Sequence, residues 1–405
     1  MSAQNGLLPA ERRVVLILGA VQFVNILDFM MVMPLGPDFA RDLGIPESSL
    51  GLIGGSYTAA AAVAGLAGAT ILDRFDRRTA LAVSMVGLFV GTVAGAFATG
   101  LGSLIAARVI AGMCGGPATA VANAILADAI PPERRGRAMG AVMGAFSVAS
   151  VFGVPFGLEV AHRWGWRAPF FAVAAMGVVV AALAVFLLPP LTAHLDNRAA
   201  PPPLRDVVAL PGAWLGGLAA ALLFGSGFLV IPNISSWFQG NLGVPRDDLG
   251  WLYLAGGSAS FLSLRVLGRL VDRYGAFGVL AGSSVVVIGV MIFCFGYPVH
   301  LPPWLWFVFF MCGSSGRNVA WQTLASKIPS PGLRARFMSL QSAIQHGASA
   351  AAAMVSASIL TSRPGGGLDG MVPLVVLSVS LSLLLVAVVA RLEALVRPRV
   401  VNPVG

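Results

Sequence analysis

The stretch MCGGPATAVANAILADAIP, residues 113–131, returns in altered form as MCGSSGRNVAWQTLASKIP at residues 311–329. At this constant offset of 198, nine of the 19 positions are identical, whereas chance in so apolar a composition gives roughly two or three. The turn Asp73-Arg74 likewise returns as Asp272-Arg273, 199 residues later. The sequence therefore indicates two similar halves joined in one chain.

The composition around the two copies excludes a water-soluble protein. Of the 405 residues, 57% are hydrophobic and 11% are charged, against roughly 25% charged in an average soluble domain. The mean hydropathy is +0.85, and so few polar groups cannot cover the surface of a soluble enzyme. A disordered chain is excluded for the same reason. A disulfide scaffold is excluded because the three cysteines lie inside apolar runs.

Twelve apolar runs divide the chain, each close to the roughly 20 residues that a membrane-spanning helix needs. They lie at about residues 14–36, 49–72, 79–98, 101–127, 137–161, 167–189, 213–238, 249–271, 277–297, 302–327, 335–361 and 371–392. The first run is too long for the core of a signal peptide, so we expect it to be retained. We predict an all-α membrane protein with twelve transmembrane helices in two pseudo-symmetric six-helix bundles.

The basic residues predict the orientation of these helices. An even number of spans puts both termini on one side of the membrane. Nineteen of the 26 basic residues fall in segments on that side, and five fall in segments on the other. Because cytoplasmic loops are enriched in Lys and Arg, we expect both termini in the cytoplasm and the chain in the inner membrane. The net charge of +9 is then a topology signal, and no nucleic-acid partner is expected.

One long, proline-rich connection separates the sixth and seventh runs. Proline-rich segments form stiff, extended spacers. The sequence thus predicts an N-terminal six-helix bundle at residues 1–192, a cytoplasmic linker at 193–207 and a C-terminal six-helix bundle at 208–405. Because the two repeats have the same orientation, a substrate site is expected between the bundles.

The motifs in and between the runs resemble those of a known family. The loop after the second run reads Asp73-Arg74-Phe75-Asp76-Arg77-Arg78, and the fifth run carries Gly153, Pro155 and Gly157. With these motifs the chain resembles the major facilitator superfamily along its whole length. It is most similar to the twelve-helix drug:proton antiporter and arabinose-efflux-permease-like branch. The glycine–proline element looks like a loose antiporter motif with a different spacing, which leaves the direction of transport open.

The resemblance implies a cytoplasmic gate at the charged turns. Its expected members are Asp73, Arg74, Arg77, Arg78, Asp272 and Arg273. Asp73 is expected near the start of the helix at Ala335, and Asp272 near the start of the helix at Arg137. An aspartate at a helix N-terminus is favourable by about 0.3–1 kcal/mol when exposed. The alternative is that the arginines only enforce topology.

Two charges lie at similar depth inside the first and fourth runs. Asp28 is roughly 12 Å and Arg108 roughly 10 Å from the outer end of its helix. A carboxylate in a half-wet cavity beside an arginine is poised to bind and release protons as the cavity alternates. We therefore predict that Asp28 and Arg108 form the proton-coupling site. The alternative is a purely structural ion pair.

Arg317 is a third charge at membrane depth, and its repeat partner is Thr119. No acidic partner is evident in the second half. Carbonyl groups at a helix C-terminus, or Asp28 across the cavity, would satisfy it. Alternatively it attracts an anionic or hydroxyl-rich substrate.

Polar and aromatic residues near these charges predict a substrate cavity. Its expected members are Gln22, Asn25, Asn233, Arg317, Asn318, Trp321, Gln322, Gln345 and His346. Pro232 is expected to break the seventh helix beside Asn233. Trp321 either stacks on a substrate ring or fills a gap. His346 either titrates near neutral pH or is a hydrogen-bonded core residue.

These features favour a secondary active transporter that works by alternating access. The expected activity is proton-coupled export of a small organic compound, either drug-like, a sugar or an amphipathic metabolite. An uptake symporter and a lipid flippase are alternatives within the class, and a membrane receptor or scaffold is the alternative outside it. No HExxH, G-x-S-x-G or Walker-type motif is present, so no enzyme, metal, cofactor or ATP site is expected. The expected partners are the substrate, protons and the lipid bilayer, and we expect a monomer.

Overall fold

The first half of the chain folds into helices that run back and forth. The computed structural model describes residues 8–71, 75–189, 191, 204–297, 299, 301–329, 333–363 and 366–396. In the N-terminal half (residues 8–191) the helices are α1 (Pro9–Val32), α2 (Gly36–Leu43), α3 (Leu50–Ile71), α4 (Arg77–Ala96), α5 (Leu101–Ala129), α6 (Pro132–Val148), α7 (Val154–Trp164) and α8 (Ala168–Leu187). Pro34 has no backbone N–H to continue α1, and a 3₁₀ turn at Met33–Leu35 joins α1 to α2.

The C-terminal half (residues 204–396) is also helical. Its helices are α10 (Leu204–Val208), α11 (Ala213–Phe228), α12 (Ile234–Ser236), α13 (Leu249–Val290), α14 (Pro303–Ala325), α15 (Arg334–Ile359) and α16 (Met371–Val396). Within α13 the backbone of Gly275 has φ +81°, so α13 is two helices joined by a turn that favours glycine. Two short antiparallel strands, β1 (Thr361–Ser362) and β2 (Leu368–Asp369), pair between α15 and α16.

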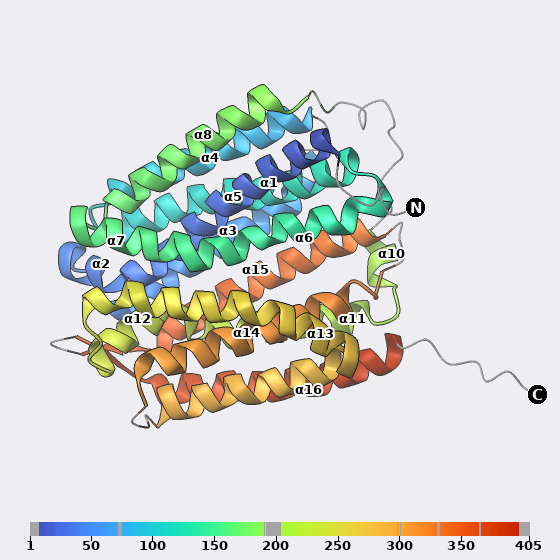
Figure 1. The fold of residues 1–405 in the computed structure, drawn as a ribbon. Coiled ribbons are helices and arrows are strands. Elements are labelled where there is room, and N and C mark those ends of the chain that lie inside the picture. The colour runs from blue at the N-terminus through green and yellow to red at the C-terminus, as the bar shows by residue number, and fades with distance from the viewer. Residues whose placement is uncertain are drawn as a thin grey trace, which may run out of the picture.

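The two halves form two bundles that lie side by side (Figure 1). Helices α3 and α15 pack against each other across the boundary, and α13 packs against α7. Helix α1 begins and α16 ends on the same face of the molecule, at the right of Figure 1, which we call the terminal face. The opposite face carries α2, α7, α12 and the β1–β2 hairpin.

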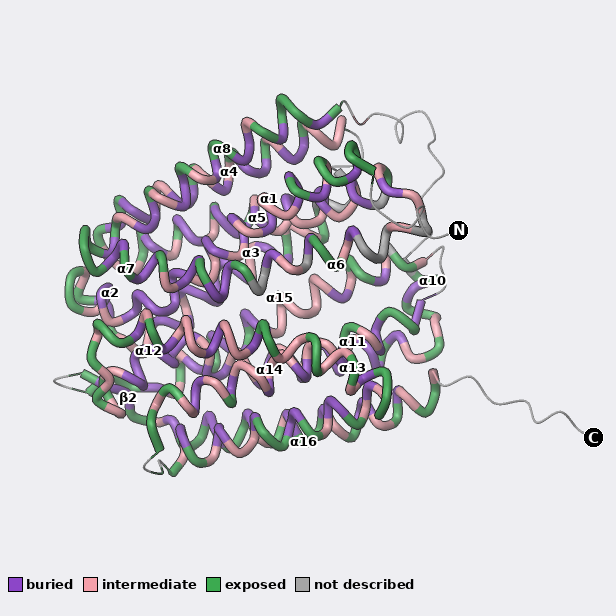
Figure 2. Tube along the Cα trace, viewed as in Figure 1, coloured by how far each residue is buried: buried purple, intermediate pink, exposed green. Residues whose placement is uncertain are grey.

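Apolar side chains fill the bundles and also cover their outside. One cluster of buried apolar residues is built almost entirely from the N-terminal half, and two others belong to the C-terminal half. Along α8 and α16, exposed positions face away from the bundles and buried ones face inward (Figure 2). Large apolar side chains are exposed too, including Phe186 at 82% and Leu16 at 73%. Such a surface fits lipid rather than water.

Eight helical segments of the described chain are long and apolar enough to cross a membrane. One of them, Arg246–Gly296, contains the two helices that meet at Gly275. The predicted all-α membrane fold is therefore confirmed, while the count of twelve spans stays a prediction. Residues 193–203 of the predicted linker at 193–207 lie outside the described residues. Its remaining residues, 204–207, belong to α10 rather than to an extended spacer.

Candidate functional site

A carboxylate and a guanidinium meet inside the N-terminal half. Asp28 lies near the end of α1, and Arg108 lies near the start of α5. Nη2 of Arg108 donates to Oδ2 of Asp28 at 2.9 Å, and Nη1 donates to Oδ1 at 3.2 Å. Their side chains are 0% and 1% exposed, so the pair is fully enclosed. The structure thus brings together the two charges that were predicted to pair because they lie at similar depth.

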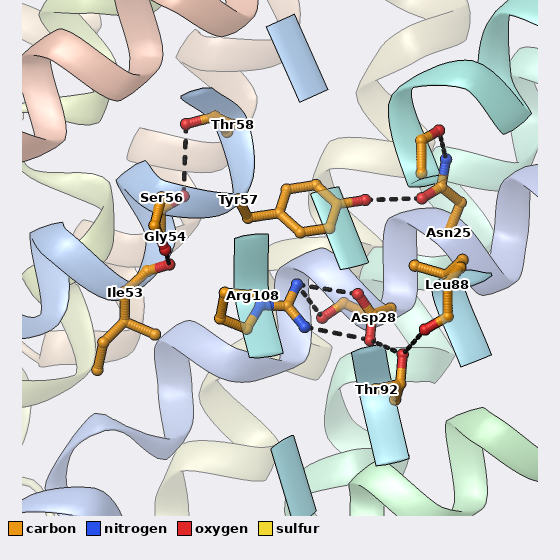
Figure 3. A network of polar contacts seen from close by, with 11 residues as sticks. Asn25, Asp28, Ile53, Gly54, Ser56, Tyr57, Thr58, Leu88, Thr92 and Arg108 are labelled. Atoms are coloured by element: carbon orange, nitrogen blue, oxygen red, sulfur yellow. Dashed lines mark hydrogen bonds and ion pairs between the residues drawn. The ribbon is translucent and has the colours of Figure 1, made fainter. Parts of the chain in front are cut away.

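Two uncharged residues complete this ion pair (Figure 3). Oγ1 of Thr92, from α4, donates to Oδ1 of Asp28 at 2.7 Å. The guanidinium carbon of Arg108 lies 4.6 Å from the centre of the Tyr57 ring, a cation–π contact. Neither residue was predicted from the sequence. A signal existed only for Tyr57, which is the one tyrosine within residues 1–191.

A chain of amide and hydroxyl groups extends from Tyr57 across α1 and α5. The Tyr57 hydroxyl donates to Oδ1 of Asn25 at 2.7 Å, and Nδ2 of Asn25 donates to Thr119 at 2.7 Å. Thr119 in turn donates to Oε1 of Gln22 at 3.1 Å. Gln22 and Asn25, both predicted cavity residues, are therefore buried partners in one network that reaches the ring beneath Arg108.

Small residues on α5 allow α3 to come close enough for this network. A Cβ atom at Gly112 would lie 2.3 Å from the backbone oxygen of Tyr57. A Cβ at Gly115 would lie 2.3 Å from the Tyr57 hydroxyl and 2.6 Å from Oδ1 of Asn25. Only glycine fits at either position, so these two residues fix where the Tyr57 ring sits relative to Arg108.

The glycine–proline motif of the fifth helix positions α7 against α1. A π-helical turn at Ala149–Gly153 precedes Pro155, whose missing N–H cannot join the ladder of hydrogen bonds. A Cβ at Gly153 would lie 2.8 Å from a methyl group of Leu27, and one at Gly157 would lie 3.7 Å from Cβ of Met31. The motif thus packs against the part of α1 that carries Asp28.

The surroundings of Asp28 are drier than the sequence predicted. Asp28 was expected in a half-wet cavity, but it is enclosed by α1, α4 and α5. Two hollows of about 350 and 480 Å³ lie elsewhere. The smaller lies on the opposite face beside Glu47 and Arg363, and the larger is a groove along α13 and α14. None of the side chains predicted to line a substrate cavity lines either hollow.

Arg317 is a buried cation in the C-terminal half. Its Nη2 donates to Oγ of Ser226 at 2.6 Å, and Ser226 is the residue that the 198-residue offset aligns with Asp28. Nη2 also lies 3.5 Å from the carbonyl oxygen of Leu223, in the last turns of α11. The guanidinium is thus held by neutral oxygens, a serine hydroxyl and a helix carbonyl. Helix carbonyls, Asp28 and a substrate were the three partners predicted for Arg317. In the structure a helix carbonyl is the one of these that contacts it.

The remaining predicted cavity residues do not converge on one place. Nδ2 of Asn233 donates to Ser356 at 2.8 Å beside the break at Pro232. Asn318 and His346 each bond a carbonyl group one turn earlier in their own helix. Trp321 is fully buried in the apolar core of the C-terminal half, which agrees with the interpretation that it fills a gap. Gln322 is exposed and Gln345 is half-buried.

The two charged turns make different contacts. Asp73 and Arg74 lie outside the described residues. Arg77 pairs with Asp128 at the end of α5, at 2.7 Å, and Arg78 donates to carbonyl groups at the end of α8. Asp272 and Arg273 are exposed on the terminal face, and Arg273 lies over the Tyr274 ring. The described contacts of Arg77 and Arg78 therefore brace α4 within its own bundle.

The two halves are fastened on the opposite face by contacts that the sequence analysis did not predict. Nη2 of Arg246 donates to Oδ2 of the buried Asp38 at 2.8 Å, and His162 faces Asp247 at 3.2 Å. Beside them, the backbone N–H of Ser48 donates to Oγ of Ser362. These partners are far apart in sequence, and each contact joins one half to the other.

Comparison with known proteins agrees with this architecture. A model described as Major Facilitator Superfamily matches residues 18–392. The chain belongs to the major facilitator superfamily. Membership makes it a multi-pass membrane transporter and not an enzyme. The expectation from its turn motifs is thereby confirmed.

Two relatives and one solved structure illustrate the likeness. A chloramphenicol resistance protein of Streptomyces lividans is 29% identical over 269 residues, which cover 64% of this chain and 67% of the relative. The purine ribonucleoside efflux pump NepI of Escherichia coli is 29% identical over 271 residues, with coverages of 65% and 67%. A D-xylose-proton symporter superposes with a TM-score of 0.75 at 15% identity, covering 92% of this chain and 97% of the symporter. That superposition bears on the fold alone.

The comparison of the two halves of this transporter yields a first prediction. Ser226→Asp gives Arg317 the carboxylate that Arg108 has in the N-terminal half. We expect it to stabilise the protein by about 1–3 kcal/mol, because a bond between two opposite charges replaces the bond of the guanidinium to a neutral hydroxyl. The melting temperature of the detergent-purified protein measures this, with Ser226→Asn as the uncharged control. A melting temperature for Ser226→Asp at or below that of Ser226→Asn would contradict the assignment.

The contact of Asp38 with Arg246, which joins the two halves on the opposite face, leads to a second prediction. Asp38→Asn is expected to weaken the closure by about 1–3 kcal/mol, because the buried carboxylate of Asp38 bonds Arg246. Asp247→Asn is the matched control, since Asp247 and His162 are largely exposed and such pairs contribute little. The readout is the yield of chemical cross-linking between cysteines placed at Ser48 and Ser362. Equal yields for the two variants would show that Asp38 does not hold the halves together.

Proposed function

We propose that the chain exports a small, uncharged, hydroxyl-bearing organic compound in exchange for protons, with Asp28 as the proton site and both termini in the cytoplasm. The observation that carries this proposal is the buried Asp28–Arg108 pair. A charged pair at membrane depth has a large desolvation cost and is a functional site by default. The excess of basic residues on the terminal face supports the orientation.

The proposed cycle follows from the enclosure of the pair. In the described conformation Asp28 has no contact with solvent, so protons must reach it in a second conformation. Rocking of the two halves, residues 1–192 against 208–405, supplies that second conformation. When Asp28 takes up a proton, Arg108 loses its counter-charge and the pair separates. Release of the proton on the other side restores the pair and resets the protein.

The substrate class follows from the relatives and from the polar groups of the chain. The printed names of two relatives concern chloramphenicol and purine ribonucleosides, which are uncharged and carry hydroxyl groups. Amide side chains such as Gln22, Asn25 and Gln345 recognise hydroxyl groups as donors or acceptors. We propose that such amides bind the substrate between the halves while the terminal face is open, and that the substrate leaves once the opposite face opens. The efflux function named for the relative NepI favours export over uptake.

The test is an accumulation assay in bacterial cells. Cells that express the chain are loaded with radiolabelled chloramphenicol or with labelled inosine, with and without a protonophore. We expect lower accumulation of at least one compound than in cells with an empty vector, and we expect the protonophore to remove the difference. Higher accumulation in expressing cells would instead indicate an uptake symporter. A difference that survives the protonophore would contradict proton coupling.

A further inference from the structure

Tyr57 lies where the ion pair meets the rest of the protein. Its ring is 5% exposed, with the Arg108 guanidinium 4.6 Å above the ring centre. Its hydroxyl donates to Asn25 at 2.7 Å, which anchors the far end of the ring beside Arg108 (Figure 3). The guanidinium is therefore held between a carboxylate that can be protonated and an aromatic face that cannot.

The Tyr57 ring also begins a row of aromatic side chains that crosses to the C-terminal half. The ring of Phe29, next to Asp28 in α1, lies 5.2 Å from the Tyr57 ring. The ring of Phe228 stacks on Phe29 with a centre-to-centre distance of 6.0 Å. Phe228 is the last residue of α11, just before the break at Pro232. The row thus links Arg108 to the broken helix of the other half.

We propose that Tyr57 is a positioning residue of the proton switch, which holds Arg108 when Asp28 is protonated and transmits the change through Phe29 to Phe228. This inference rests on the proposed function. Once Asp28 is neutral, the buried guanidinium keeps two electron-rich neighbours, the ring face of Tyr57 and the backbone carbonyl oxygen of Asp28, which lies 3.4 Å from Nη2. Closer contact of Arg108 with the ring moves the ring, and aromatic side chains packed in a row pass on such shifts because interiors are close-packed.

Few ionisable groups surround this ring. Helix α1 contributes Asp28, and α5 contributes Arg108 and Cys114. Helix α4 contributes the uncharged Thr92. Helix α15, which packs along the other side of α3, carries His346, whose Nδ1 is bonded to its own helix at Ser342. A pH response that depends on the Tyr57 ring therefore reports on Asp28 and Arg108.

The test varies the charge of the ring face without changing its size. Tyr57→Phe is the starting variant, and phenylalanines with one, two and three ring fluorines are then incorporated at position 57. Each fluorine weakens the attraction of the ring for a cation. Transport of the compound identified in cells is measured in proteoliposomes as a function of pH. A ring that attracts the guanidinium less stabilises the state with protonated Asp28 and freed Arg108 less. Asp28 then takes up its proton only at lower pH, so the pH of half-maximal transport is expected to fall stepwise, by about 0.5–1 pH unit over the series.

A second variant tests the row of rings separately. Phe29→Leu keeps Tyr57 beside Arg108 but breaks the contact with Phe228. We expect the pH of half-maximal transport to stay within about 0.2 pH unit of wild type, since the cation–π contact is intact. The maximal rate is expected to fall about tenfold, because the halves no longer move together with the switch. An unchanged maximal rate would contradict transmission through the row.

The outcomes separate the two proposals. A wild-type protein whose transport does not respond to a pH gradient contradicts the proposed function and this inference with it. A responsive wild type with one and the same pH of half-maximal transport across the fluorinated series contradicts the role of Tyr57 alone. A stepwise decrease supports it.

Discussion

Asp28→Asn is expected to abolish proton-driven export while the protein remains in the membrane. The amide has the shape of the carboxylate and keeps an oxygen for Thr92, but it carries no charge and binds no proton. Arg108 is then a buried cation without a counter-charge, which is expected to cost about 3–5 kcal/mol of stability. Transport into proteoliposomes under a pH gradient measures the first effect, and thermal unfolding in detergent measures the second.

A double variant separates coupling from folding. Asp28→Asn combined with Arg108→Gln removes both charges, and a neutral pair in the same place is expected to recover most of the lost stability. It is not expected to recover transport driven by the pH gradient, because no titratable group remains. Retained gradient-driven transport in Asp28→Asn, at more than about a tenth of the wild-type rate, would show that the proton binds elsewhere.

Gly51→Val is expected to hold the two halves apart on the opposite face. A Cβ atom at Gly51 would lie 2.1 Å from the backbone oxygen of Ala353 and 3.2 Å from Cβ of Ala357, so α3 and α15 cannot close. Because that obstacle is backbone, relief requires the helices to separate. Transport is expected to fall at least tenfold, since one of the two alternating conformations is lost.

The closure itself is measured by cross-linking. Cysteines at Ser48 and Ser362, whose hydroxyl oxygens are 3.3 Å apart, are introduced after Cys114, Cys294 and Cys312 are replaced by alanine. A short cross-linker is expected to join them in the parent and not in Gly51→Val. Gly65→Val is the control on the same helix, since a Cβ there meets nothing within 4 Å. Equal cross-linking in the two valine variants would contradict the claim that Gly51 governs closure.

The sequence predicted the charged part of the site because charges stand out in an apolar helix. Asp28 and Arg108 were found in this way, and their similar depth made a pair between them possible. Thr92 was missed because single uncharged polar residues are common in membrane helices. Tyr57 is the one tyrosine within residues 1–191, but a single tyrosine has no spacing pattern that predicts its partner. Arg317 was found, but its partner Ser226 required the repeat offset and the structure together.

The closure of the two halves was harder to predict than the bundles. Turn motifs drew attention to Arg77 and Arg78, whose described contacts lie within one bundle. The pair of Asp38 with Arg246 joins α2 to the turn before α13, 208 residues further along the chain, and nothing in their local sequence relates them. Trp321 was ambiguous for a similar reason. A buried tryptophan and one that binds substrate have the same sequence pattern, and only its enclosure in the core distinguishes them.

Proton release on substrate binding shows whether Asp28 is the group that gives up its proton to the transport cycle. Purified wild-type protein in weakly buffered detergent solution, with a pH-indicating dye, is mixed with the compound identified in cells. We expect about one proton to be released per molecule bound, because the substrate favours the conformation in which Asp28 is paired with Arg108. Asp28→Asn is expected to bind the compound and release none. Equal release from the wild type and from Asp28→Asn would contradict the account.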